Sequence, residues 1–309
     1  MLVGIPASGK SSFSRERERE GYAVLSSDSI RAAMLAEDGM RDMPEDEDRL
    51  FDLNRRVFHM ISENATSLLN DGRSVVIDAT NLNRRRRINL LREIGAVDCV
   101  KKCILFITPR EVCLERNARR SGIALVPDSD MRRMIASFEC PVLAEGWDAI
   151  TPVISGEEYR FPFEEAIDFS QDNPHHSLTL YGHLTAARRY AEENGYSERL
   201  CEVAYYHDIG KLYVKEFKSF NGEPSATAHF YGHENYGAYL YLCEKCCGKE
   251  LSDAELCEVL YRACLINSHM RPLNAWNESP RALARDAVLF GDDFIAEVKL
   301  LNKADIAAH

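Results

Sequence analysis

The sequence predicts two domains of different class, and three observations lead to this prediction. First, a glycine-rich phosphate-binding motif stands between an apolar start and a helical segment, and short apolar segments alternate with helical ones over residues 1–155. Second, Gly156, Pro162 and several acidic residues interrupt this pattern over residues 156–172. Third, residues 173–309 show helical segments without strong strands and contain most of the histidines. We therefore expect an α/β domain with a parallel sheet and flanking helices, a linker, and an all-α domain.

The composition of the chain indicates a globular protein with two domains. The 309 residues are enough for two hydrophobic cores, and 45% hydrophobic with 28% charged residues is typical of globular proteins. We expect no membrane span and no signal peptide, because no apolar segment has the required length. Ten scattered cysteines, among them a group at 243, 246 and 247, are then expected to be reduced thiols of a cytoplasmic protein.

The net charge of -11 argues against a protein that coats nucleic acid non-specifically. This net charge is compatible with a local basic groove that binds one end of a nucleic-acid strand. Two arginine groups are candidates for such a groove, or else they cover solvated helix faces: residues 84–87, and Arg116, Arg119 and Arg120.

The phosphate-binding motif G-x-x-x-x-G-K-[ST] is matched by Gly4-Ile5-Pro6-Ala7-Ser8-Gly9-Lys10-Ser11. It follows a β-prone segment at residues 1–3 and precedes a helix from Ser12, which favours a phosphate loop over an accidental turn. Backbone N–H groups and the helix dipole then face the phosphates. Lys10 would reach the β- and γ-phosphates, and the Ser11 hydroxyl would bind Mg²⁺. The residues expected to bind ATP are Gly4, Ser8, Gly9, Lys10, Ser11 and Ser12.

Two aspartates follow predicted strands at residues 22–26 and 74–78. In a parallel sheet both would lie at the carboxyl edge, beside the phosphate loop. Asp28 can accept the proton of an attacking hydroxyl, or it can cap the following helix. Arg31, one turn later, could hold a phosphate of the acceptor. Asp78 occupies the position that steadies Mg²⁺ in phosphate-loop enzymes.

Further elements of the first domain are a helix over residues 51–69, a strand over 102–107 and a helix over 110–120. In the last of these, Arg116 and Arg120 are spaced i, i+4 and would share one helical face. Guanidinium groups in this arrangement can close as a lid over the γ-phosphate while charge develops there.

The ordered set of these motifs resembles the 5′-hydroxyl polynucleotide kinases. It consists of G-x-P-x-S-G-K-S from Gly4, S-x-D-x-x-R from Ser26, D-x-T-N-x-N and the arginine run from Asp78, and R-x-x-x-R from Arg116. The resemblance covers about half the chain and extends to small-molecule kinases with similar patterns. It implies Asp28 as general base, Arg31 as the acceptor-phosphate contact, Arg116 and Arg120 as the lid, and ATP with Mg²⁺ as cofactors.

Histidines and aspartates recur along the second domain. His176 and His183 are seven residues apart, which places them on one face of a helix. Taken singly, each histidine could be a buried, hydrogen-bonded residue. Burying all of them without partners would be costly, and a metal centre with imidazole and carboxylate ligands removes that cost. The candidates from this half of the chain are seven histidines and two aspartates: His175, His176, His183, His207, Asp208, His229, His233, His269 and Asp305.

The order H…HD…H…H…D, with the core His-Asp-Ile-Gly-Lys from His207, resembles the all-helical HD phosphohydrolase superfamily. The resemblance implies that His183, His207, Asp208 and Asp305 bind a first metal. It also implies that His233 and His269 bind a second ion or the substrate phosphate. Lys211, together with His176 or His229, would contact phosphate. Mixed ligands of this kind leave Mn, Fe, Co, Ni and Zn open.

Fusions of these two modules resemble the bacterial HD–polynucleotide-kinase enzymes that heal RNA ends, although the HD module can come first in them and comes second here. The resemblance implies ATP-dependent phosphorylation of a 5′-OH on RNA or DNA. It also implies removal of a 2′,3′-cyclic, 2′- or 3′-phosphate, so that a ligase can seal the ends. Two alternatives stay open: the same two enzymes acting on a nucleoside or other metabolite, and an ATP-dependent nucleotide sensor.

Overall fold

The structure is a computed structural model that describes residues 1–309 apart from 41–42, 45, 96, 175–176 and 309. The chain forms two compact units. The first contains Met1–Met131 and Pro141–Ile154, and the second contains Arg132–Cys140 and Ser155–His309. The short segment Arg132–Cys140 belongs to the second unit although it precedes the predicted linker. There the Asn267 side chain binds the Phe138 carbonyl at 3.0 Å and the Cys140 N–H at 2.8 Å.

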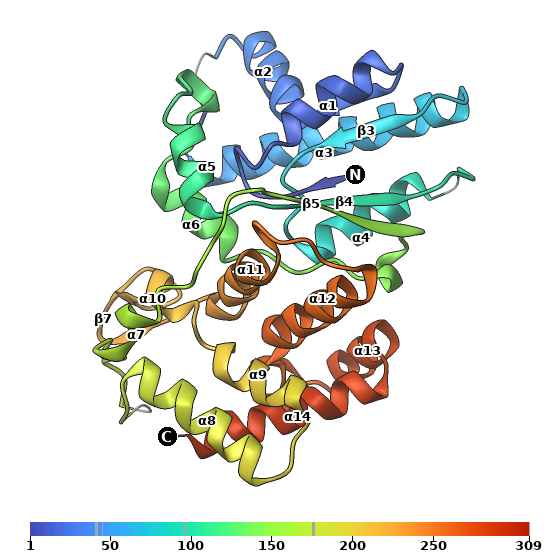
Figure 1. Ribbon diagram of the computed structural model, residues 1–309. Coiled ribbons are helices and arrows are strands. Elements are labelled where there is room, and N and C mark those ends of the chain that lie inside the picture. Colours follow the sequence, from blue (N-terminus) through green and yellow to red (C-terminus); the bar gives the residue numbers. More distant parts are fainter. Residues whose placement is uncertain (41–42, 45, 96, 175–176, 309) are drawn as a thin grey trace. The chain divides into compact units, whose positions relative to one another are not determined.

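The first unit contains a parallel sheet (Figure 1). Strand β1 pairs with β4 and β4 with β5, while β2 pairs with β3. The Gly4 N–H donates to the Thr80 carbonyl at 3.0 Å and links the two groups in the order β2-β3-β1-β4-β5. Parallel strands bring their carboxyl ends to one edge, where the predicted site residues follow β1, β2 and β3. The strands are β1 (Leu2–Val3), β2 (Ala23–Ser26), β3 (Val75–Asp78), β4 (Lys102–Ile107) and β5 (Ala149–Ile154).

Helices flank this sheet, and α3 supplies much of its core. Leu53, Val57, Ile61 and Ala65 recur every four residues of α3 and pack with α2, α4 and β3. The predicted helix over residues 51–69 is confirmed, and it begins earlier because the Asp46 side chain caps it. The helices are α1 (Lys10–Arg19), α2 (Ser27–Glu37), α3 (Glu47–Asn70), α4 (Arg84–Ile94), α5 (Arg110–Asn117) and α6 (Asp128–Ile135).

Two elements of the first unit differ from the sequence prediction. Strand β5 was missed because Pro152 interrupts its apolar residues, yet an edge strand tolerates proline. Helix α5 ends at Asn117, so Arg120 lies beyond it. The Asn117 side chain contributes to this end by binding the Val126 carbonyl at 2.7 Å and its N–H at 3.1 Å.

The second unit is mostly helical, as predicted. Helix α11 is almost entirely buried and packs against α12, and α8 packs against α9 and α14. The helices are α7 (Phe163–Ile167), α8 (Leu180–Glu193), α9 (Glu198–Tyr206), α10 (Lys211–Val214), α11 (His233–Cys246), α12 (Asp253–Ser268), a π-helical turn at Pro272–Trp276, α13 (Pro280–Phe290) and α14 (Asp292–Ala307).

The expectation of a domain made only of helices is wrong in one place. Strands β6 (Glu216–Lys218) and β7 (Pro224–His229) form an antiparallel hairpin between α10 and α11. Its turn contains Gly222, whose φ of 84° favours glycine. The alternating Ser-Ala-Thr-Ala of β7 is too short and too weakly apolar to stand out as a strand in sequence.

Two further expectations concern membranes and thiols. Within the described residues, no helix has the length and apolar character that crossing a membrane requires. Cys243, Cys246 and Cys247 lie buried at the end of α11, in keeping with a packing role.

Candidate functional site

The phosphate loop has the predicted strand–loop–helix context. Helix α1 begins at Lys10 directly after Gly9, whose φ of 109° is left-handed and requires glycine. Gly4 is equally constrained, since a β-carbon there would lie 2.8 Å from both the Phe106 Cβ and the Ser8 Oγ. The loop glycines thus permit a turn that L side chains would not fit.

Lys10 lies inside this loop. Its buried Nζ donates to the carbonyls of Gly4 at 2.9 Å and Ile5 at 2.7 Å. Burial lowers the pKa of Lys10 to about 8, and the negative charge of Asp78 partly opposes this. Ser8 supplies a second sign of an anion site, because its buried Oγ has no partner among the described residues. A bound phosphate would satisfy both groups.

The two predicted Mg²⁺ residues lie on neighbouring elements. Asp78 ends β3, and its Oδ2 accepts a hydrogen bond from Ser14 Oγ at 2.8 Å. Burial raises the pKa of Asp78, while the Ser14 bond and the Lys10 charge lower it. Ser11 and Ser12 are exposed in the first turn of α1. A carboxylate and a hydroxyl beside a phosphate loop are the oxygen ligands that Mg²⁺ uses in this context.

The structure brings Asp28 and Arg31 together. Arg31 NH1 donates to Asp28 Oδ1 at 2.7 Å, and its NH2 donates to Asn54 Oδ1 at 3.1 Å. The alternative that Asp28 caps α2 is wrong, because Ser26 is the N-cap and accepts from the Ser29 N–H. The Asp28 side chain is 83% exposed, so its carboxylate is accessible to an acceptor.

The two arginines of the predicted lid do not share a helical face, since α5 ends between them. Arg116 NH1 donates to the carbonyl of Ala7 in the phosphate loop at 3.5 Å, whereas Arg120 NH1 donates to the Ala124 carbonyl at 3.4 Å. The charge of Arg120 still contributes, after burial, to the lowered pKa of Lys10. Of the two, Arg116 makes the direct contact with the loop.

Part of the arginine run has a structural role. Arg87 is fully buried, and it donates to the Glu145 carboxylate at 2.7 and 2.6 Å and to the carbonyls of Asn81 and Leu82. Arg84 Nε also donates to Glu145, at 3.3 Å. The expectation of a basic groove over residues 84–87 is wrong for Arg87, whose charge is neutralised inside the unit.

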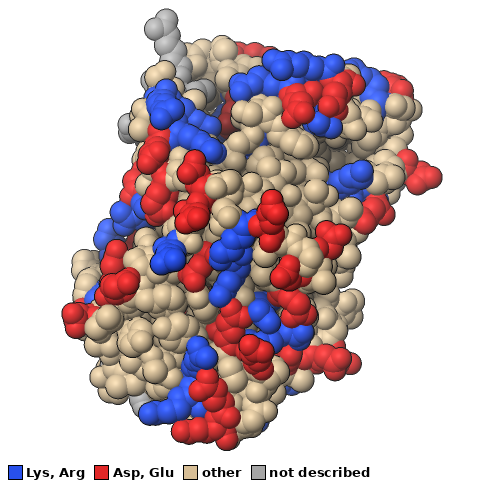
Figure 2. All heavy atoms as spheres, viewed as in Figure 1, with Lys and Arg blue, Asp and Glu red and all other residues tan. Residues whose placement is uncertain are grey.

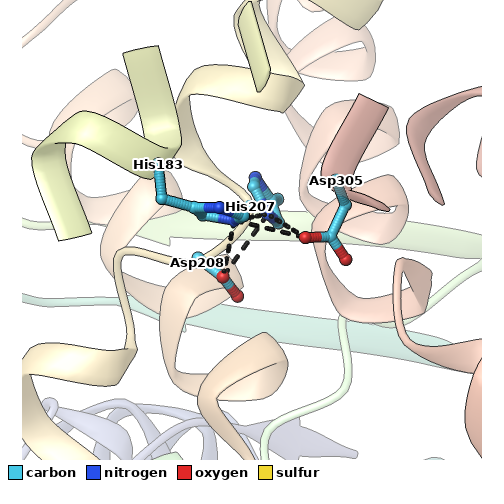
Figure 3. Close-up of side chains that lie close together, drawn as sticks. All are labelled: His183, His207, Asp208 and Asp305. Atoms are coloured by element: carbon cyan, nitrogen blue, oxygen red, sulfur yellow. Dashed lines mark hydrogen bonds and ion pairs between the residues drawn. The ribbon is translucent and has the colours of Figure 1, made fainter. Parts of the chain in front are cut away.

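Four residues of the second unit meet around one point (Figure 3). His183 comes from α8, His207 and Asp208 follow α9, and Asp305 comes from α14. His183 Nε2 lies 3.2 Å from both Asp208 Oδ2 and Asp305 Oδ1. The corresponding distances from His207 Nε2 are 3.4 Å each.

Asp208 also belongs to a second group. Its other oxygen, Oδ1, lies 3.0 Å from His233 Nε2 and 3.4 Å from His269 Nε2. Both groups are buried, and each has the spacing of ligands around one ion. We name the residues of both groups, His183, His207, Asp208, His233, His269 and Asp305, the HD cluster.

The orientation of the imidazoles favours a cation. In all four rings Nδ1 faces a backbone carbonyl, which can only accept, so Nδ1 carries the hydrogen. In neutral rings the Nε2 atoms then offer lone pairs to each other, at 3.1 Å between His183 and His207 and at 3.2 Å between His233 and His269. Two acceptors at these distances repel unless a proton or a cation lies between them. Histidines oriented by backbone carbonyls are typical of metal sites.

The pKa shifts in the HD cluster also favour a bound proton or cation. Burial alone would lower the pKa of His183, but hydrogen bonds to Asp208 and Asp305 raise it to about 9. The pKa of Asp208 lies well below its ordinary range despite burial, because Lys211 and His207 stabilise the carboxylate. The two carboxylates of the cluster therefore supply negative charge that a proton or a divalent ion can neutralise.

Lys211 lies beside the HD cluster, as predicted. Its buried Nζ lies 2.6 Å from Asp208 Oδ2 and donates to Gln171 Oε1 at 2.9 Å. Gln171 was missed in sequence because it falls in the predicted linker, with no motif around it. It holds the lysine through a neutral oxygen, while Asp208 provides the ion pair.

The remaining histidine candidates are not among the groups described above. His175 and His176 lie outside the described residues. His229 ends β7, where its Nε2 contacts Ser225 Oγ at 3.1 Å and its ring stacks on Tyr231. A phosphate contact by His176 or His229 stays a prediction.

Replacing Gly210 with alanine is expected to lower the free energy of unfolding by about 1–3 kcal/mol or more and to weaken metal binding. A β-carbon at Gly210 would lie 2.1 Å from the His233 carbonyl oxygen and 2.6 Å from the Gly237 nitrogen. Relief of this overlap must move Asp208 and Lys211 away from His233. Urea unfolding and metal titration would measure both effects. Gly156→Ala is the control, since nothing lies within 4 Å of its β-carbon; equal losses in the two variants would contradict the expectation.

Comparisons with known proteins concern the first unit. Residues 1–141 match the model of an AAA domain family. Among solved structures, a proposed kinase from Chloroflexus aurantiacus J-10-fl is similar at 20% identity and a TM-score of 0.39, covering 49% of this chain and 81% of that one. No curated protein matches in sequence. Together with the loop geometry and the parallel sheet, this match agrees with a phosphate-loop α/β domain in the first unit.

Proposed function

We propose that this protein is a bifunctional enzyme that heals nucleic-acid ends. One unit transfers the γ-phosphoryl group of ATP to a polynucleotide 5′-OH, and the other removes a 2′,3′-cyclic, 2′- or 3′-phosphate. The observation that carries the proposal is the HD cluster. Its four imidazole nitrogens and two carboxylates converge beside a buried lysine, in a chain that also has a phosphate loop.

In the kinase half, the loop N–H groups, Ser8 and Lys10 bind the triphosphate, and Ser11 and Asp78 hold Mg²⁺. Asp28 accepts the proton of the attacking hydroxyl, and Arg31 positions the acceptor phosphate while remaining paired with Asp28. Arg116 and Arg120 stabilise the charge that develops on the transferred group. This division of roles is the one that phosphoryl transfer requires.

In the hydrolase half, His183, His207, Asp208 and Asp305 would hold one divalent ion. His233 and His269 would hold either a second ion, together with Asp208, or the substrate phosphate. Such ions lower the pKa of a bound water and neutralise the phosphoryl group. Lys211, positioned by Asp208 and Gln171, contacts the substrate phosphate. Imidazole and carboxylate ligands together suit Mn, Fe, Co, Ni or Zn.

One proposed reaction adds phosphate and the other removes it. This pair of reactions favours a broken strand as the substrate, with one reaction at each of its two ends. Adding and removing phosphate on the same small molecule would be a futile cycle, whereas a 5′-phosphate and a free 3′-OH are what a ligase joins. Acidic and basic side chains are interspersed on the face seen in Figure 2. The net charge of -11 also argues for recognition of a strand end rather than of a long backbone.

Labelled ATP offered together with a 5′-OH oligonucleotide and free nucleosides tests the kinase half. We expect label on the oligonucleotide, while label only on nucleosides would indicate a metabolite kinase. Oligonucleotides ending in a 2′,3′-cyclic or 3′-phosphate test the other half, with release of a free 3′-OH as the expected result. Nucleotide binding without any turnover would indicate a sensor.

A further inference from the structure

The β6–β7 hairpin and the residues after it expose several aromatic rings. Phe220 is 84% exposed, Phe217 is 48% exposed and Tyr231 is 39% exposed. We name these three residues and His229 the hairpin aromatic group. Large apolar rings that gather at the surface of a globular unit are typical of binding sites.

The rings of this group are held in a defined arrangement. His229 lies parallel to Tyr231, with centroids 5.4 Å apart and planes at 4°, and Ser225 Oγ contacts the His229 Nε2. Phe220 meets Tyr231 edge to face, at 5.6 Å and 75°. One face of Tyr231 is thus covered by His229, whereas the Phe220 ring is left open to a ligand.

The hairpin aromatic group is continuous with the HD cluster. Phe230, directly before Tyr231, accepts a hydrogen bond from His233 Nδ1 at 2.7 Å. The Lys211 ammonium lies 5.3 Å from the Phe230 ring centroid, and β7 lies beside α10 in Figure 1. The exposed ring of Tyr231 therefore lies one residue from Phe230, whose ring contacts the lysine and whose backbone carbonyl accepts from a cluster histidine.

Two lysines lie near the rings, and one of them, Lys215, is ion-paired with Asp172 at 2.6 Å. Lys215 Nζ lies 5.7 Å from the Phe217 centroid and 4.7 Å from that of Phe169. Lys218 is exposed on β6. A ligand that suits this surface has a flat aromatic face and carries a phosphate within reach of Lys211. A nucleotide at the end of a single strand has both.

We propose that the hairpin aromatic group binds a nucleobase of a single-stranded polynucleotide whose terminal phosphate lies at the HD cluster. This inference rests on the proposed hydrolase function for the position of the phosphate. The base stacks on Phe220, and Tyr231, braced by His229, fixes the orientation of Phe220. Stacking accepts any base, so the site selects single-stranded ends without selecting their sequence.

Fluorescence anisotropy with the full-length, metal-loaded protein tests base binding. The probe is a short single-stranded RNA that ends in a 3′-phosphate, compared with one whose 3′-terminal nucleotide is abasic. Phe220→Ala is expected to weaken binding of the first RNA by about 5-fold to 100-fold, the range for loss of one stacked base. It should leave the abasic RNA unaffected. Val288→Ala, at a residue that is 88% exposed on α13, is the control and should change neither.

Hydrolysis of the same two RNAs separates base binding from a structural role. Phe220→Ala should raise KM for the first RNA with little change in kcat, and Phe220→Trp should restore KM. Equal losses on both RNAs, or no loss on either, would overturn the proposal. If the wild type hydrolyses neither RNA, the hydrolase function fails, and a selective loss of binding in Phe220→Ala would still support the base site.

Discussion

Replacing Asp208 with asparagine is expected to abolish metal binding at the HD cluster and to lower phosphate hydrolysis by more than about 100-fold. Loss of even an outer partner of a metal ligand costs about 10-fold to 100-fold, and Asp208 is the one residue that belongs to both candidate metal groups. The change also removes the charge partner of buried Lys211, which costs about 3–5 kcal/mol of unfolding free energy. Metal analysis of the purified variant and end-group assays measure the first two effects.

Asp286→Asn is the matched control for this experiment. Asp286 is a buried acid of the same unit, and its Oδ2 accepts hydrogen bonds from Arg271 and the Trp276 indole. This variant should lose stability yet retain metal and hydrolysis, because these partners lie outside the HD cluster. Equal metal content in the two variants would remove Asp208 from the metal site. Phosphorylation of 5′-OH ends should be unchanged in both, once the proteins are shown to be folded at the assay temperature.

Replacing Lys10 with alanine is expected to lower phosphoryl transfer from ATP by about 100-fold to 1000-fold or more. Removal of one preorganised donor from a site of developing charge has an effect of this size. The Lys10 ammonium is already held inside the loop by the carbonyls of Gly4 and Ile5, so it need not be ordered when ATP binds. Initial rates with labelled ATP and a 5′-OH oligonucleotide measure the loss.

Lys102→Ala serves as the control for Lys10, since it removes an exposed lysine of β4 outside the phosphate loop. It should leave transfer unchanged. Removal of the terminal 3′-phosphate should be normal in both variants, because the two centres use separate residues. A hydrolysis defect in Lys10→Ala would show that the centres depend on each other and would contradict two independent reactions.

Local pattern was enough to predict the phosphate loop and most of the first unit. Glycines 4 and 9 are required by backbone conformation and close approach, which are properties of a few consecutive residues. The strand ending at Asp78 was predicted from a continuous apolar run, and the long helix α3 was predicted from the helical period of its apolar residues. The edge strand β5 and the hairpin were missed, since each lacks such a period over its short length.

The side-chain roles required the tertiary structure. The run over residues 84–87 is uniform in sequence, but Arg87 is fully buried against Glu145, 58 residues away, and Arg84 also contacts Glu145. Arg116 and Arg120 do not share the predicted helical face, because α5 ends at Asn117, whose side chain contributes to this end. The role of Gln171 in positioning Lys211 follows from a contact between their side chains, which the sequence does not indicate.

The sequence by itself determined which residues carry groups suited to phosphate and metal, because residue type and local spacing set that chemistry. Tertiary structure alone decided that His183 and Asp305, which are far apart in the chain, lie 3.2 Å from each other. It also decided that each imidazole turns its Nε2 toward Asp208 by donating Nδ1–H to a backbone carbonyl. Such an arrangement depends on helix packing, which buries the polar groups together so that a shared cation can offset the cost of their desolvation.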